Sequence, residues 1–280
     1  NTAREGIVIS RMVWDALLYR DPATNEYLPN LATSYNWVDS KTLEFDLRKG
    51  VTFHNGEKFD ADDVVYTLTY VSNPENGAKP ARNVNWWDNA EKIGDYKVRL
   101  NLKKEFPAAL EFLSGPIVMY PNEYYAKVGP EGMAINPVGT GPYAVTSVEA
   151  GKRYKFKKYD NYHASSPKGQ ANIGNITIRT IAESNTQLAE LFSGGVDWIW
   201  KVKPDQAERI AAQGQFTVKN ASTMRIGYLN FDAMGRHSEN PMNDVRVRRA
   251  IAHAIDREGI VNALVGGESM VVHSLCFPSQ

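Results

Sequence analysis

The chain contains residue types that catalyse reactions, but not at the spacings that catalysis requires. Five histidines are scattered along it, and no two have the His-x-x-x-His spacing that would hold zinc on one face of a helix. The single cysteine, Cys276, can form neither an internal disulfide nor a Cys-x-x-Cys site, and no Gly-x-Ser-x-Gly nucleophile elbow occurs. The sequence therefore predicts no catalytic residue, no metal site and no cofactor. The histidines are His54, His163, His237, His253 and His273.

Two further motifs have a chemical and a structural interpretation. Gly139-Thr-Gly141 could suggest a phosphate loop, but it lacks the Lys-Ser ending and the following helix that phosphate binding requires. A tight backbone connection explains this motif better. Asp15 and the pair Asp62-Asp63 could act as an acid and a base, but Asp62 and Asp63 fit the first turn of a helix, where their charge is stabilising.

Composition indicates an ordinary globular protein without a dominant charge. The chain has 280 residues, 42% hydrophobic and 23% charged, and its 32 basic residues balance 32 acidic ones. That balance disfavours nucleic-acid binding. No window is apolar enough to cross a membrane, and the first residues do not form a signal peptide, so we expect a mature or trimmed product. One cysteine does not identify the cellular compartment.

Hydrophobic periodicity predicts strands and helices in mixed order. Residues 42–47 alternate apolar Leu43, Phe45 and Leu47 with acidic side chains, which is the pattern of a half-buried strand. A tight turn at Asn55-Gly56 follows. This order is typical of α/β or α+β proteins with mixed sheets, and local pattern does not choose between them. The other predicted strands are 96–102, 142–148, 153–159, 175–181, 196–200 and 225–231.

Aspartates mark the expected helix starts. Asp60 can cap a helix whose buried stripe is Val64, Val65, Leu68 and Val71, and Asp244 can cap one with Val247, Ile251 and Ile255 inside. Asp256 then starts a helix that stops at Gly266-Gly267. The other predicted helices are 106–112, 186–192 and 204–212.

Three ordered stretches resemble the family 5 extracellular solute-binding proteins, the peptide- and nickel-binding components of ABC importers. They are residues 31–66, which include Val51-Thr-Phe-His-Asn-Gly56, then Pro137-Val-Gly-Thr-Gly-Pro-Tyr143, and then Asn243-Asp-Val-Arg-Val-Arg-Arg-Ala-Ile251 with its continuation to Arg257. The resemblance implies a two-lobed, periplasmic-binding-protein-like fold of type II, similar to cluster C. Family members are longer, so the chain looks truncated in the second lobe, and we expect it to be part of a longer molecule.

The resemblance also implies a division of the chain. Residues 1–28 and 120–226 correspond to the core of the first lobe, 29–119 to an inserted domain, and 227–280 to the beginning of the second lobe. The family residues that fix the ends of a bound peptide come mainly from the part of the second lobe beyond Gln280.

Five residues are candidate ligand contacts by this resemblance. Asp15, beside Trp14, takes the place of an acidic residue that receives a ligand's amino group, although a helix-surface aspartate is the alternative. Tyr228 lies where the family crosses between lobes, and core packing is its alternative. Trp86 and Trp87 fall where the inserted domain faces the ligand; adjacent tryptophans in an extended segment should not share one core, so we expect one exposed ring.

The implied function is the binding component of an ABC importer, not an enzyme. The resemblance implies capture of a short peptide between two lobes, hinge closure, and delivery to the transmembrane subunits of a permease by a monomer in the periplasm or lipid-anchored outside the cell membrane. Alternatives on the same fold are binding of an oligosaccharide, an opine or a nickel chelate, and ligand sensing for a membrane receptor.

Overall fold

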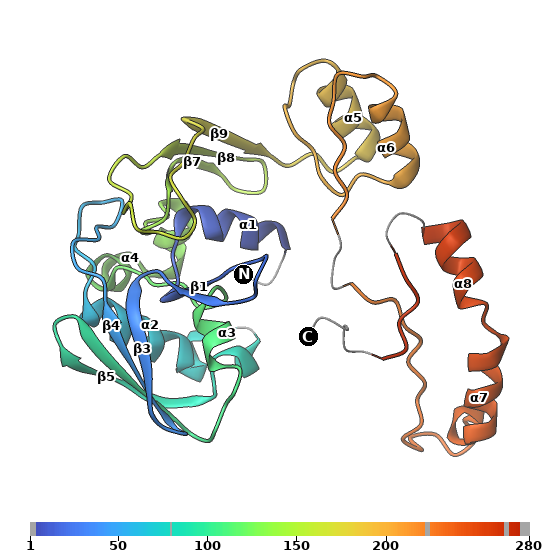
Figure 1. Cartoon of the computed structure of the whole chain (residues 1–280), viewed down its shortest axis with the longest axis horizontal. Helices are drawn as coiled ribbons and strands as arrows, with labels where there is room; N and C mark the ends of the chain where they lie inside the picture. Colours follow the sequence, from blue (N-terminus) through green and yellow to red (C-terminus); the bar gives the residue numbers. More distant parts are fainter. Residues whose placement is uncertain (1–3, 79, 222–224, 266–268, 275–280) are drawn as a thin grey trace. The chain divides into compact units, whose positions relative to one another are not determined.

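The computed structural model describes residues 4–78, 80–221, 225–265 and 269–274, which form two compact units. Unit 1 runs to Ile181 and unit 2 begins at Ala182. Unit 1 combines sheets with helices, whereas the described part of unit 2 contains helices and irregular segments (Figure 1). The chain is therefore a mixed α/β protein, as predicted. The division into four segments implied by the resemblance stays a prediction.

The described residues of unit 1 form three antiparallel sheets. The first pairs β1 with β2, the second has the order β3-β4-β6-β5, and the third has the order β7-β8-β9. Because neighbouring strands in each sheet are antiparallel, short turns connect many of them. The strands are β1 (Leu18–Arg20), β2 (Tyr27–Pro29), β3 (Ala32–Asp39), β4 (Thr42–Leu47), β5 (Trp87–Gly94), β6 (Lys97–Leu102), β7 (Tyr143–Glu149), β8 (Arg153–Lys158) and β9 (Asn175–Arg179).

Helices cover the sheets of unit 1 and make up most of the regular structure described in unit 2. In unit 1 they are α1 (Arg4–Val13), α2 (Ala61–Ser72), α3 (Ala109–Leu113) and α4 (Asn122–Ile135), and in unit 2 they are α5 (Ser184–Phe192), α6 (Pro204–Ala211), α7 (Val245–Ala254) and α8 (Arg257–Ile260). Short 3₁₀ turns occupy Pro74–Asn76, Ala81–Asn83 and Pro241–Asn243, and a π-helical turn follows α8 at Val261–Val265.

The largest core lies between the four-stranded sheet and α2. Strand β4 buries Leu43, Phe45 and Leu47 on this side, which confirms the predicted alternation. From α2, Val64 and Leu68 pack into the same cluster. The predicted strand and the predicted helix therefore meet through the side chains that their periodicity selected.

The start of α2 is fixed by a reciprocal cap. The Asp60 side chain accepts a bond from the Asp62 N–H at 2.8 Å, and the Asp63 carboxylate accepts one from the Asp60 N–H at 2.9 Å. Asp63 is buried, and it also accepts a bond from the N–H of Asn122 at the start of α4. The predicted helix-end role of Asp62 and Asp63 is thus correct, and Asp63 additionally joins two helices.

Two predicted strands of unit 2 are absent from the structure, and this corrects the sequence-based expectation. Residues 196–200 form a loop between α5 and α6, because Val196 and Ile199 pack against the small apolar cluster of those helices. Residues 225–231 have no strand partner among the described residues, and Leu229 is 63% exposed. The predicted stop at Gly266-Gly267 lies outside the described residues.

The two capped helices predicted near the C-terminus are present. Asp244 caps α7 by accepting a bond from the Arg246 N–H at 2.8 Å, and Asp256 caps α8 by accepting one from the Gly259 N–H at 2.9 Å. No residue of α7 is buried, so the predicted inner face of this helix packs less closely than its periodicity suggested.

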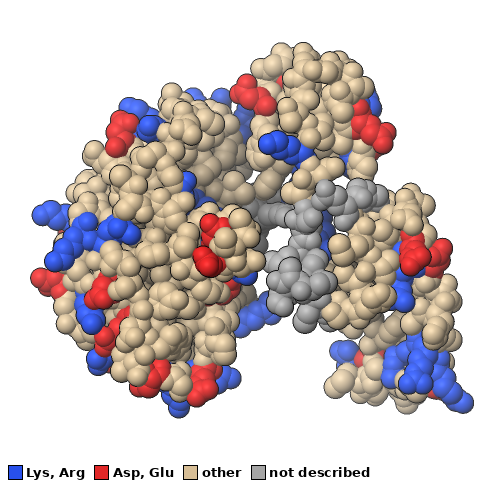
Figure 2. Space-filling view, in the orientation of Figure 1, with Lys and Arg blue, Asp and Glu red and all other residues tan. Residues whose placement is uncertain are grey.

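Surface charge is mixed. Figure 2 shows Lys, Arg, Asp and Glu side chains interspersed over the visible face of unit 1. Among the described residues, no helix has the length and apolar character needed to cross a bilayer.

Candidate functional site

Asp15 lies in unit 1 between the end of α1 and the start of β1, and its side chain is fully buried. The Lys168 ammonium lies 2.6 Å from its Oδ1 atom, and the Asn30 amide and the Tyr162 hydroxyl donate to the same oxygen. The Thr140 hydroxyl donates to Oδ2 at 3.1 Å. A buried carboxylate needs donors of this kind, because no solvent stabilises its charge.

Lys168 does more than neutralise Asp15. Its ammonium also donates to the carbonyl oxygens of Arg11 at 2.7 Å and Trp14 at 2.9 Å, which close the last turn of α1. A cation at the C-terminal end of a helix is favourable because the free carbonyl groups there carry partial negative charge. The pair therefore fixes the backbone that carries Trp14 and Asp15.

His163 lies beside this network, and one of its ring nitrogens makes no hydrogen bond. Its Nε2 atom is buried, has no hydrogen-bond partner, and lies 4.0 Å from Asp15 Oδ2. Burial lowers the pKa of His163, and the nearby Asp15 carboxylate opposes that effect. Burial also raises the pKa of the Tyr162 hydroxyl, whose oxygen lies 2.6 Å from that of Ser166. Both pKa shifts favour the neutral forms of His163 and Tyr162.

The Gly139-Thr-Gly141 motif packs backbone against backbone. A Cβ atom at Gly139 would collide with the carbonyl oxygen of Val13 and the ring of Trp14, and one at Gly141 would collide with the backbone of Met12 and Val13. The Gly141 N–H donates to Val13 O at 2.8 Å. The motif is a tight connection, as the sequence analysis favoured, and it places Thr140 against Asp15.

His54 ties the same motif to the segment between β4 and α2. Its backbone N–H donates to Gly139 O at 2.9 Å, the Gly139 N–H donates to its Nδ1 atom at 3.3 Å, and Nε2 lies 2.9 Å from Gly141 O. Nδ1 is therefore an acceptor and Nε2 carries the proton. Burial lowers the pKa of His54. Beside it, the Tyr159 hydroxyl donates to Phe53 O at 3.0 Å.

The structure brings Trp14 and Asp15 together but gives Asp15 no exposed surface. The Trp14 indole N–H donates to Val138 O at 2.8 Å, and its ring packs edge-on against Tyr120 at 5.9 Å between centroids. A ligand amine at Asp15 would have to replace Lys168. The role of Asp15 in receiving a ligand stays a prediction, whereas its alternative as a helix-surface aspartate does not fit its burial.

Trp86 and Trp87 are both buried, at 4% and 1% exposure, so the expectation of one exposed ring is wrong. Trp87 begins β5 and Trp86 precedes it, and a shift in strand register follows Trp87. The chain therefore does not alternate its side chains regularly here. The two rings meet edge to face at 4.7 Å between centroids, and Trp86 stacks on Phe106. Their ligand contact stays a prediction.

Tyr228 belongs to unit 2, lies outside any strand and is 67% exposed. That exposure does not fit the alternative of core packing. Sequence analysis missed Lys168, Asn30 and Tyr162, because nothing in the local sequence links them to Asp15. The position of Thr140 between two glycines was the one available signal, because close backbone packing brings such a residue against its neighbour.

The fold defines the class of protein to which this chain belongs. The structure superimposes on that of NikZ from Campylobacter jejuni in complex with Ni(L-His) with a TM-score of 0.79 and 25% identity, covering 91% of this chain and 50% of that one. It matches a dipeptide-binding protein from Pseudoalteromonas sp. SM9913 in complex with Met-Leu with a TM-score of 0.78 and 25% identity, covering 94% and 55%. The fold is that of bacterial solute-binding proteins.

The chain belongs to the bacterial extracellular solute-binding proteins, family 5, whose middle region it matches over residues 26–280. It is 24% identical to the dipeptide-binding protein of Escherichia coli (strain K12) over 280 aligned residues, which cover 92% of this chain and 51% of the relative. The chain thus spans about half the length of the relatives it matches. The Escherichia coli and Pseudoalteromonas relatives are named as dipeptide-binding proteins, which agrees with the prediction of a protein that is not an enzyme.

Within the described residues, no group of three or more His, Cys, Asp or Glu side chains is placed to hold a metal ion. A polar, fully partnered network at Asp15 instead gives unit 1 a rigid position for Trp14. The network at Asp15 can therefore hold the surface around Trp14 in a fixed position. Its described residues include no activated nucleophile.

Proposed function

We propose that this chain is the solute-capturing part of an ABC importer and that the solute is a short peptide. Membership of family 5 and the similarity to the dipeptide-binding protein that holds Met-Leu are the observations that support it. In this proposal the ligand is enclosed between two lobes, a hinge closes, and the closed form delivers the ligand to a membrane permease.

Closure of this kind requires the ligand to bind the closed state more tightly than the open one, because only a difference in affinity shifts the equilibrium. A wall that does not deform makes that difference larger, since ordering the wall then costs no entropy on binding. The partnered network around Asp15 suits unit 1 to be such a wall. We place the protein in the periplasm or lipid-anchored outside the cell membrane, as a monomer.

The full protein that carries this chain should be titrated calorimetrically with a library of dipeptides and tripeptides. Saturable binding of at least one peptide, with the peptide recovered unchanged by mass spectrometry, is the expected result. Tyr228→Ala should weaken that binding about fivefold or more, because a contact at the centre of a ligand site is often worth more than about 1 kcal/mol. Because Tyr228 is exposed, the variant should keep its thermal stability.

A second candidate ligand is a nickel chelate, which the similarity to NikZ bound to Ni(L-His) favours. The same titration with nickel and L-histidine together, and with each alone, separates the two ligands. If the protein binds the chelate and no peptide, the ligand is the chelate, and the class of protein is unchanged. An oligosaccharide or an opine is tested in the same way. Pull-down of permease subunits or of a membrane receptor distinguishes import from sensing.

A further inference from the structure

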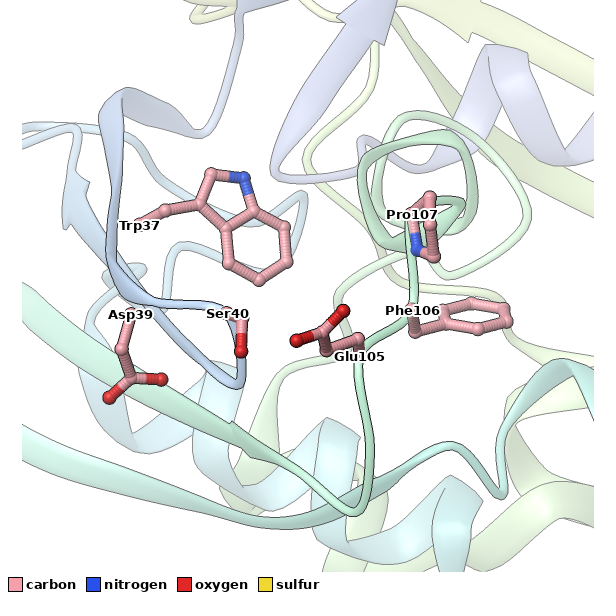
Figure 3. A pocket seen from close by; sticks show the side chains of 6 residues that line it. All are labelled: Trp37, Asp39, Ser40, Glu105, Phe106 and Pro107. Atoms are coloured by element: carbon pink, nitrogen blue, oxygen red, sulfur yellow. The ribbon is translucent and has the colours of Figure 1, made fainter.

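A shallow hollow of about 270 Å³ lies on unit 1 beside the β3–β4 turn, apart from the network at Asp15. The turn and the segment after β6 form it together, and the Leu102 N–H joins them by donating to Lys41 O at 2.7 Å. Figure 3 shows the Trp37 ring on one side and the Glu105 side chain on the other. The lining residues are Trp37, Asp39, Ser40, Glu105, Phe106 and Pro107.

Most of the hollow is held rigidly. The Asp39 carboxylate accepts bonds from the Lys41 N–H at 2.7 Å and the Thr42 hydroxyl at 3.0 Å, which fixes the turn. Phe106 stacks on Trp86 and forms part of a buried aromatic cluster, so the Glu105–Pro107 segment is anchored to the core. Trp37 itself packs against that core with part of its surface free. The hollow is therefore formed before any ligand arrives.

Glu105 is the residue of the hollow that can bind a ligand through its charge. Its carboxylate is exposed and makes no hydrogen bond or ion pair with any residue in the described part of the chain. Figure 3 shows it directed toward the space between Trp37 and Ser40, whereas Asp39 points away from that space. No Lys or Arg lines the hollow. An unpaired carboxylate and a partly exposed indole ring therefore share the hollow (Figure 3).

A cation would satisfy both groups. The face of an indole ring carries negative charge density and attracts a cation placed over it, and a carboxylate adds an ion pair. A guanidinium group suits this arrangement better than an ammonium group, because it is planar, weakly hydrated, stacks on aromatic rings and offers parallel N–H donors to a carboxylate. A bound metal ion does not fit, since an aromatic ring and a single free carboxylate supply too few ligands.

We propose that this hollow binds a guanidinium group, stacked on Trp37 and paired with Glu105. The guanidinium is carried either by a small free cation or by an arginine side chain. Because the hollow is open to solvent, the affinity is low, in the millimolar range, as exposed cation–π contacts and ion pairs are individually weak. The site does not depend on the transported solute and is independent of the proposed function.

The test follows the indole N–H signal of Trp37 by NMR in the intact, ¹⁵N-labelled protein. Trp37→Phe identifies that signal by its loss. Acetyl-arginine amide should shift it saturably, and acetyl-citrulline amide, which has the same shape and no charge, should not. Methylguanidinium distinguishes the two sources: an equal effect shows that a free cation suffices, and a weaker effect shows that a peptide-borne side chain is preferred.

Two variants make the result specific. Glu105→Gln removes one charge from an exposed side chain, so the fold is retained, and it should weaken the binding of acetyl-arginine amide about two- to fivefold. Glu131→Gln, at an exposed glutamate of α4 outside the hollow, is the matched control and should leave the affinity unchanged. The proposal is wrong if the Trp37 signal responds equally to arginine and citrulline derivatives, or if Glu105→Gln binds as tightly as the wild type.

Discussion

The Lys168 ammonium lies 2.6 Å from the Asp15 carboxylate, and the two side chains join sequence positions at opposite ends of unit 1. Asp15 follows α1, and Lys168 lies in the loop between β8 and β9. Because Asp15 is fully buried, its charge needs a counter-ion. The contact therefore ties the loop after β8 to the end of α1, and it is the natural first target for mutation.

Lys168→Met should destabilise unit 1 by about 3–5 kcal/mol, because it leaves the buried Asp15 carboxylate without its counter-ion. The measurement is chemical denaturation followed by circular dichroism. Lys127→Met, at an exposed lysine of α4, is the matched control and should change stability by less than about 0.5 kcal/mol. Adding Asp15→Asn to Lys168→Met should recover part of the loss, and an equal loss in both lysine variants would contradict the role assigned to this pair.

The pKa of His54 is lowered by burial, which predicts a loss of stability in acid. A histidine with a folded pKa below its unfolded value stays neutral in the fold, so its contribution is fully present above the unfolded pKa of about 6.5. That contribution is lost as the pH falls below this value toward the folded pKa. A proton on Nδ1 would also face the Gly139 N–H that now donates to it.

The free energy of unfolding should therefore be measured between pH 5 and 8 (a window set around the ordinary histidine pKa of about 6.5) for the wild type and His54→Gln. Their difference should shrink as the pH falls through that window. His237→Gln changes an exposed histidine of unit 2 and is the matched control. A constant difference for His54→Gln would refute the prediction.

Asp63 should give a pH dependence of the opposite sign. Burial raises its pKa from 3.8 to about 7, although bonds from the Asn122 and Asp60 N–H groups oppose the shift. The folded state then holds the proton more tightly than the unfolded state, so this contribution is present below pH 3.8 and is lost as the pH rises to about 7. The loss amounts to no more than about 4 kcal/mol.

Asp63→Asn removes this titration, and it costs about 1–3 kcal/mol at low pH because an amide presents one oxygen to two N–H donors. The gap between wild type and variant should narrow as the pH rises from about 4 to 7. The two unfolding curves, compared at several pH values, provide the check. A gap that widens with pH would show that the bonds from Asn122 and Asp60 outweigh burial.

Gly139→Ala should prevent normal packing of the Gly139-Thr-Gly141 connection. The new Cβ atom would collide with the Val13 carbonyl, which is backbone and cannot move aside cheaply. We expect a loss of several kcal/mol or failure to fold, measured by thermal unfolding and by soluble yield. Gly174→Ala is the control, because a Cβ atom there meets no atom within 4 Å. Similar losses in both variants would indicate an effect of the glycine backbone in general.

Local patterns predicted the parts of the fold that depend on neighbours in sequence. The alternation of residues 42–47 and the caps at Asp60, Asp244 and Asp256 are found in the structure, because a strand face and a helix cap involve only nearby residues. Residues 225–231 show the limit of this reasoning. Their composition favours a strand, but a strand also needs a partner, and sequence pattern does not reveal one.

The candidate site shows the same limit more sharply. Asp15 was identified by resemblance, whereas the partners that enclose it come from three distant segments and carry no local signal. Trp86 and Trp87 were misjudged for another reason. Regular alternation was assumed across a position where the strand begins and its register shifts, so both rings reach the core.

The clamp between His54 and the Gly139–Gly141 connection determines how slowly its amides exchange with deuterium. The N–H groups of His54 and Gly139 donate within it, and the Gly141 N–H donates to Val13 O beside it. Local opening at the edge of one sheet does not expose these amides to solvent, because the clamp joins two distant stretches of chain. Their exchange therefore requires unit 1 to open as a whole, and these three amides should share one common, high protection factor.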